Sequence, residues 1–338
     1  MASTDFWALE RTNRRETALL VVAFLMLLAA LGFGLDLLAG TLRITADGSL
    51  VGFPLLTLAA LIIGVIQASA SYFGGAALVL ASVHARELAP DTAQHQMVLD
   101  VIREMAIAAR MPVPRACLID DPAPNAFATG RDPAHSVICV TQGLVNTMDR
   151  EELQGVLGHE MAHIRDYDIR TMMMIAVMVG GIAMLADFAY RWMWFGGFST
   201  RRRDNSSEGG GGGALILLAV MILAALAPIF SQLLAMAVSR QREYLADAAS
   251  VEFTRNPRAL LRALQTIAKV ESPLRTASRG TAHLFIVNPL QGARDDDEGF
   301  WDNLLSTHPP LSRRIARLQA LLNEAPAAVP PTAEVSRG

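Results

Sequence analysis

Long uncharged hydrophobic blocks constrain this chain more than any other feature of its sequence. Thr17–Leu35 carries no charge over 19 positions, Leu50–Val83 none over 34, and Ala214–Val238 none over 25. A helix needs about 20 apolar residues to cross the hydrocarbon core of a bilayer, so these three blocks predict membrane-spanning helices. A weaker block, Thr171–Ala186, has 16 residues before Asp187. The first block is too long for a simple signal peptide, and no small-residue cleavage site clearly follows it.

The composition agrees with a membrane protein. Of 338 residues, 52% are hydrophobic and 18% are charged, whereas about a quarter of the residues in an average soluble domain are charged. The net charge of -3 is small and gives no indication of a nucleic-acid partner. The two cysteines, Cys117 and Cys139, lie in apolar surroundings without a C-x-x-C partner. This favours two buried thiols in a reducing compartment over a disulfide or a metal role.

The hydrophobic blocks divide the chain into five parts. We expect an N-terminal membrane region with two transmembrane helices (1–83), the first part of a soluble domain (84–170), a hydrophobic helical hairpin with a glycine-rich loop (171–239), the second part of the domain (240–324) and a disordered tail (325–338). The loop, 201–213, begins with three arginines and ends in five glycines. Its sequence assigns it no role beyond flexibility.

The first polar stretch predicts a small α+β unit. Its apolar period indicates a helix over Asp100–Ala109. Short apolar runs at Ala116–Ile119 and Ser136–Val140 predict strands, with Asn125–Thr129 as a possible edge strand. The whole chain is therefore expected to be a mostly α membrane protein, with about four hydrophobic helices and a small α+β domain.

The strongest chemical signal is an H-E-x-x-H motif formed by His159, Glu160 and His163. Positions i and i+4 share one face of a helix, so both imidazoles can ligate one metal ion. The glutamate between them is then placed to act as a general base. Asp149 can cap this helix, because Glu152 follows three residues later and completes a capping box. The alternative is a helix that carries two ordinary histidines.

A catalytic zinc ion takes three protein ligands and keeps one position open. The second polar stretch offers Glu243 and Asp247, which are four residues apart and share a helical face. Glu243 can complete a site for one zinc ion per chain, and Asp247 can accept a hydrogen bond from a ligand histidine. The alternative is an ordinary charged helix that leaves the membrane. Manganese or cobalt would also accept these ligands in vitro.

Four motifs together resemble one protein family. They are H-E-M-A-H at 159–163, R-E-Y-L-A-D at 242–247, P-N-A-F-A-T-G at 124–130, and T-H-P-P at 307–310 followed by Arg313 and Arg314. With a hydrophobic hairpin between the first two motifs, the chain resembles the HtpX-type membrane proteases, which are gluzincin relatives of the type I CAAX prenyl proteases. The resemblance extends from the first membrane block to about Leu322 and does not include the glycine-rich loop.

The resemblance implies roles for five residues of the two polar stretches. They are the zinc ligands His159, His163 and Glu243, the catalytic base Glu160 and the ligand-orienting Asp247. It also implies that Asn125–Ala128 forms an edge strand that pairs with an extended substrate backbone. His308 would assist the oxyanion or the substrate, although an ordinary loop histidine beside two prolines is an equal alternative.

The implied function is a zinc-dependent endopeptidase that hydrolyses misfolded or damaged membrane proteins and their cytosolic loops. The resemblance places this activity in membrane-protein quality control under stress. The implied partners are the lipid bilayer and unfolded membrane-protein substrates, with no nucleic acid. The natural substrates, the cleavage preference, the regulation and the oligomeric state stay open.

The topology follows in part from the charges that flank the blocks. Three arginines precede the first block, whereas the loop Asp36–Leu50 holds only Arg43. The positive-inside rule therefore places the N-terminus in the cytoplasm, and two crossings return the chain there. Because the zinc ligands lie in both polar stretches, the site is expected to face the cytoplasm of a bacterial inner membrane. Arginines between the last two blocks oppose a full crossing of 171–239, and the sequence leaves this open.

Three other functions are compatible with parts of the sequence. An intramembrane protease would place its zinc motif inside a hydrophobic segment, whereas charged residues surround this one. A prenyl-protein protease usually has more than four spanning segments. A non-catalytic scaffold with a structural zinc would supply four protein ligands and no general base, so Glu160 argues against it.

Overall fold

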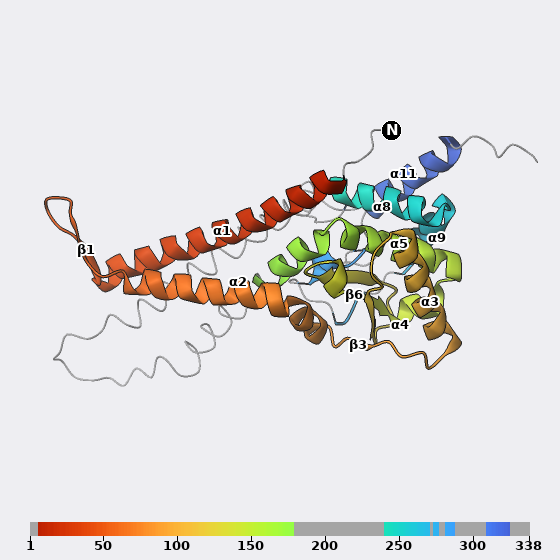
Figure 1. Cartoon of the computed structure of the whole chain (residues 1–338), viewed down its shortest axis with the longest axis horizontal. Helices are drawn as coiled ribbons and strands as arrows, with labels where there is room; N and C mark the ends of the chain where they lie inside the picture. The colour runs from red at the N-terminus through yellow and green to blue at the C-terminus, as the bar shows by residue number, and fades with distance from the viewer. Residues whose placement is uncertain (1–5, 179–239, 271–272, 277–280, 288–308, 325–338) are drawn as a thin grey trace, which may run out of the picture.

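The computed structural model describes residues 6–178, 240–270, 273–276, 281–287 and 309–324. Within these residues the chain is mostly helical, with two small sheets. Several predictions lie outside the described residues: the second half of Thr171–Ala186, all of Ala214–Val238, the glycine-rich loop, His308 and the tail. Figure 1 shows a long helical pair that extends from a mixed domain of helices and strands.

The helical pair consists of α1 (Phe6–Ala39) and α2 (Leu55–Ser82), which lie side by side (Figure 1). A hairpin of β1 (Leu42–Ile44) and β2 (Leu50–Gly52) joins them at the end far from the domain. Both helices are long and apolar enough to cross a membrane, which agrees with the first two hydrophobic blocks. Many of their large apolar side chains point outward and are exposed, as lipid-facing side chains are.

The Asp36 side chain joins α1 to the first turn of α2 at the end of the pair far from the domain. Its carboxylate accepts hydrogen bonds from the backbone N–H groups of Leu56 and Thr57, at 2.9 and 2.8 Å, and from the Thr57 hydroxyl at 2.7 Å. The first N–H groups of a helix have no partner inside the helix, so a buried carboxylate at this point satisfies them. Asp36, the charged residue directly after the first hydrophobic block, therefore caps α2.

The domain is built on a four-stranded sheet with the order β3-β4-β6-β5. The strands are β3 (Arg86–Glu87), β4 (Arg115–Ile119), β5 (Ala126–Gly130) and β6 (Ser136–Thr141). β4 and β6 are parallel and the other pairs are antiparallel. The strands predicted over 116–119 and 136–140 are confirmed, and the predicted edge strand is β5, which ends the sheet.

Several helices of the domain pack against the sheet or against one another. They are α3 (Ala93–Ala108), α4 (Gln142–Thr147), α5 (Arg150–Arg165), α8 (Arg240–Thr254), α9 (Pro257–Ala268) and α11 (Leu311–Glu324). The helix predicted over 100–109 is the second half of α3. It begins earlier because the Thr92 hydroxyl accepts a hydrogen bond from His95 N at 3.1 Å and so caps a polar first turn.

The two faces of the sheet bury different neighbours. Ile138 and Val140 belong to a core shared with α3, α5 and α9, whereas Cys139 belongs to a second core. That second core includes Val79 and Val83 at the end of α2. The membrane pair is therefore packed directly onto the domain. Cys139 and its register partner Cys117 are buried free thiols, as the sequence predicted.

Candidate metal centre

The motif helix α5 presents three buried residues, His159, Glu160 and His163. Its start is fixed by the predicted capping box. The Asp149 carboxylate accepts from Glu152 N at 2.8 Å, and the Glu152 carboxylate accepts from Asp149 N at 3.0 Å. Because the box sets where the helix begins, it also sets the rotation at which the two histidines leave the helix.

Small residues bring α8 and α9 close to α5. A Cβ atom on Gly155 would lie 2.4 Å from Leu260 N, so only glycine permits this approach. The Ser250 hydroxyl donates to the Gly155 carbonyl at 2.6 Å, and Ala162 packs against Ala246. This close packing places Glu243, in the first turn of α8, next to the two histidines of α5.

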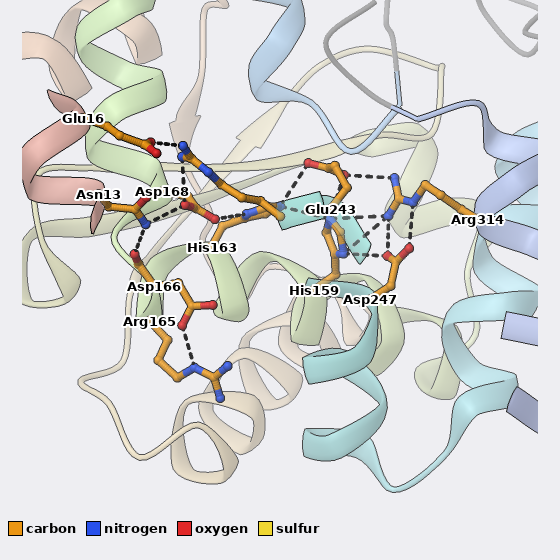
Figure 2. Close-up of polar contacts among 11 residues, drawn as sticks. Asn13, Glu16, His159, His163, Arg165, Asp166, Asp168, Glu243, Asp247 and Arg314 are labelled. Atoms are coloured by element: carbon orange, nitrogen blue, oxygen red, sulfur yellow. Dashed lines mark hydrogen bonds and ion pairs between the residues drawn. The ribbon is translucent and has the colours of Figure 1, made fainter. Parts of the chain in front are cut away.

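Three ligand-type atoms converge between α5 and α8 (Figure 2). The Nε2 atoms of His159 and His163 are 3.2 Å apart. Glu243 places one carboxylate oxygen 3.6 Å from His159 Nε2 and the other 3.5 Å from His163 Nε2. Ligand atoms held about 2.1 Å from a tetrahedral ion such as zinc are about 3.4 Å apart. The residue set predicted for the metal is therefore assembled at the spacing that one such ion requires.

The outer nitrogens of both histidines face carboxylates. Asp247 Oδ1 is 2.9 Å from His159 Nδ1, and Asp168 Oδ2 is 3.1 Å from His163 Nδ1. A carboxylate only accepts, so each Nδ1 carries the proton and each Nε2 of a neutral ring carries a lone pair. Two lone pairs that face each other beside a third carboxylate repel, and a cation between them removes the repulsion. The donor set thus fits a divalent metal ion.

Sequence reasoning missed the role of Asp168. Helix α5 ends at Arg165 with Asp166 as its C-cap, Tyr167 adopts a positive φ of 63°, and a new helix starts at residue 168. This break turns Asp168 back toward His163. Asp168 also accepts hydrogen bonds from Asn13 Nδ2 at 2.8 Å and from Arg242 Nη1 at 3.2 Å. The only signal in the sequence was a carboxylate five positions after the second histidine.

Two residues of the membrane helix α1 take part in this network. Besides its bond to Asp168, Asn13 Nδ2 donates to the backbone carbonyl of Asp166. Glu16 pairs with Arg242, which in turn pairs with Asp168. Figure 2 shows the resulting line of contacts, which runs from Glu16 through His163 and Glu243 to Arg314.

Arg314 closes the other side of the site. It enters from the first turn of α11 and is 1% exposed. Its guanidinium donates to both oxygens of Asp247, at 3.0 and 2.6 Å, and lies 3.3 Å from a Glu243 oxygen. Burial raises the pKa of Asp247, but Arg314 and His159 lower it by more, so the net shift is downward. The sequence motif contained Arg314 but gave it no role.

Glu160 lies beside the two histidines and is 2% exposed. Burial raises the pKa of its carboxyl, and the neighbouring histidines offset only part of that effect. A carboxyl with a raised pKa holds a proton more readily than an exposed glutamate, which suits a group that both accepts and delivers protons. Among the described residues, no other histidine, cysteine, aspartate or glutamate cluster has the spacing of a metal site.

The edge strand predicted over Asn125–Ala128 exists as β5, but its outer side is occupied. Phe127 forms an antiparallel bridge with Phe285. Ile286 N donates to the Ala126 carbonyl at 3.0 Å. Asn125 Nδ2 donates to the Val287 carbonyl at 2.9 Å. In the part of the chain that the structure describes, the edge expected to bind a substrate therefore binds residues 285–287.

Two histidines and a carboxylate that converge beside a buried glutamate, on helices packed over a mixed sheet, define a metallopeptidase of the H-E-x-x-H class. The chain belongs to Peptidase family M48, whose model matches residues 92–322. This membership makes the chain a hydrolase of peptide bonds, and its two apolar helices make it membrane-associated.

Curated relatives agree with the resemblance seen in the sequence. The chain is 40% identical to a "Protease HtpX homolog" of Lactobacillus acidophilus, over 91% of this chain and 97% of the relative. It is 39% identical to a protein of the same name from Streptococcus mutans, with the same coverage. Among solved structures, the crystal structure of S. mikatae Ste24p matches with 18% identity and a TM-score of 0.47, covering 94% of this chain and 66% of that chain.

Proposed function

We propose that this chain is a zinc-dependent endopeptidase of the bacterial inner membrane whose active site faces the cytoplasm. Its ligands are His159, His163 and Glu243, and its general base is Glu160. Its substrates are unfolded or damaged membrane proteins and their cytosolic loops, which fits a role in quality control under stress. The observation that supports it most is the convergence of three ligand atoms beside the buried Glu160.

The residues of the site have distinct tasks in peptide hydrolysis. Zinc, when bound, supplies a Lewis acid that activates water and polarises the peptide carbonyl. Glu160 accepts a proton from the attacking water and delivers it to the nitrogen of the leaving amine. Asp247 and Asp168 keep His159 and His163 in the tautomer that turns Nε2 inward.

The position of α1 supports a site at the membrane surface. The uncharged stretch of this helix starts at Thr17, and the two residues that touch the site network, Asn13 and Glu16, lie just before it. Residues before the apolar stretch belong to the headgroup region of a bilayer. A site at this level reaches loops and unfolded segments near the membrane. The arginines before Thr17 favour the cytoplasmic side.

Peptide hydrolysis is expected to depend on one zinc ion per chain. The protein would be purified in detergent with a chelator, which also limits self-digestion, and then assayed on an unfolded test protein before and after zinc is restored. We expect cleavage to appear in step with zinc binding and to reach its full rate at one equivalent. Cleavage that persists in chelator would contradict the metal assignment, and a zinc-loaded protein that cuts no unfolded substrate would contradict general proteolysis.

Asp168→Asn is expected to weaken zinc binding about 10- to 100-fold, because the amide no longer fixes the tautomer of His163. Competition with a chromogenic chelator measures the affinity. Asp166→Asn is the matched control, since Asp166 is also buried and lies two residues away but forms its ion pair with Arg165. Equal affinities of the two variants would show that Asp168 does not support the metal site.

A further inference from the structure

A short segment of the chain lies where a substrate strand would be expected. Residues 285–287 follow the turn Ala282–Leu284 and run antiparallel to the edge strand β5. Three contacts hold them there: the Phe127–Phe285 bridge, the hydrogen bond from Ile286 N to the Ala126 carbonyl, and the hydrogen bond from Asn125 to the Val287 carbonyl. An extended peptide that added to β5 would use the same Ala126 carbonyl and Asn125 side-chain amide.

The segment also reaches the metal site. Arg314 Nη1 donates to the Ile286 carbonyl at 2.8 Å, and the same nitrogen lies 3.3 Å from a Glu243 oxygen. The Ile286 carbonyl and the candidate metal ligand Glu243 therefore contact the same nitrogen of Arg314. The Ile286 carbonyl lies at the place where the carbonyl of a bound peptide would lie if the peptide followed β5 toward the site.

The backbone pairing of this segment with β5 is shorter than the pairing within the sheet. β5 pairs with β6 over five residues, whereas it meets residues 285–287 at a single isolated bridge. The side chains of the segment are nevertheless buried. Phe285 is fully buried, with its ring edge-to-face on Phe127 at 4.9 Å between centroids, and Ile286 is almost as buried. A peptide with the same backbone contacts and similar apolar side chains can therefore replace it at little cost.

We propose that residues 285–287 form an internal strand that occupies the position of a substrate strand beside β5 and that substrates must displace it. In the displaced state, Arg314 Nη1 and Asn125 Nδ2 bind carbonyls of the substrate, and the Ala126 carbonyl accepts a substrate N–H. This position beside β5 selects extended apolar segments with an aromatic or large aliphatic residue opposite Phe127. This inference rests on the proposed function, because it concerns substrates of the same site.

Ile286→Pro tests the proposal because proline lacks the N–H that donates to the Ala126 carbonyl, and its fixed φ further weakens the pairing of the internal strand. Ile286→Val is the matched control, because valine has as many side-chain carbons as proline and keeps the N–H. One net hydrogen bond corresponds to about a fivefold change in an equilibrium constant. We expect Ile286→Pro to lower KM for an extended apolar fluorogenic peptide about fivefold relative to Ile286→Val, with kcat unchanged. An equal or higher KM in Ile286→Pro would overturn the proposal.

A second measurement needs neither turnover nor the proline variant. The zinc-loaded Glu160→Gln protein would be mixed with the same apolar peptide, and amide hydrogen exchange would be followed at residues 282–287 and in β5. Displacement predicts faster exchange at 282–287 while β5 stays protected by the peptide. The wild-type protein would be assayed for cleavage of the same peptide. Faster exchange at 282–287 in Glu160→Gln, together with no cleavage by the wild type, would support displacement and contradict the proposed function. If the wild type cuts the peptide and exchange at 282–287 is unchanged, the inference fails alone.

Discussion

Glu160→Gln is expected to lower the rate of peptide hydrolysis about 10³-fold while one zinc ion stays bound per chain. The amide has the shape of the carboxylate but cannot accept a proton from water, and general-base catalysis contributes about 10²- to 10⁴-fold. Zinc stays because Glu160 is not among the three converging ligand residues. The measurements are the rate of cleavage of an unfolded protein and the bound zinc, counted on the same sample.

Glu151→Gln is the matched control for this change. Glu151 lies in the first turn of the same helix, is exposed, and faces Arg262 rather than the metal site. We expect it to keep the wild-type rate, which would show that loss of a carboxylate from α5 does not by itself stop turnover. A Glu160→Gln protein that cleaves as fast as Glu151→Gln would refute the assignment of the general base.

Arg314→Ala is expected to lower the free energy of unfolding by about 3–5 kcal/mol. This is the usual penalty when one partner of a buried charge network is removed and the other charges stay buried. Here the carboxylates left without the guanidinium are Asp247 and Glu243. Urea unfolding of the chelated protein in detergent measures the effect without a contribution from metal binding.

Two variants separate charge from geometry at Arg314. Arg313→Ala removes the neighbouring arginine, which is exposed, and we expect a change of less than about 0.5 kcal/mol. Arg314→Lys keeps a positive charge but cannot hold both Asp247 oxygens and the Ile286 carbonyl with one planar group, so it should recover only part of the stability. If Arg314→Ala is as stable as Arg313→Ala, the guanidinium does not hold the site together.

Local patterns in the sequence predicted the parts of the site that local structure builds. The spacing of His159 and His163 is a property of one helix, and the Asp149 cap needs only the next three residues. Both are present in the structure. Glu243 and Asp247 were also predictable as a pair on one helical face, and the need of a catalytic zinc for a third ligand connected that face with the histidines before the resemblance to a family supported it.

The remaining contacts depend on packing between distant segments, which no short window of sequence contains. Asp168 reaches His163 because the chain breaks at Tyr167, a bulky residue for which a positive φ is unusual. Arg314 binds Asp247 from 67 residues further along the chain. An arginine on an amphipathic helix is normally assigned to the surface. Residues 285–287 carry no strand pattern long enough to reveal a pairing with β5.

The contacts between α1 and the site also limit how this chain can be divided. The family model starts at residue 92, yet Asn13 and Glu16 hold Asp168 and Arg242 from the opposite end of the sequence. A fragment trimmed to the family boundaries would lose these contacts and uncover the sheet face on which Val79 and Val83 pack. A lipid-free catalytic fragment therefore needs substitutions that replace the contacts made by α1 and α2. Deletion of these two helices alone would not preserve the site.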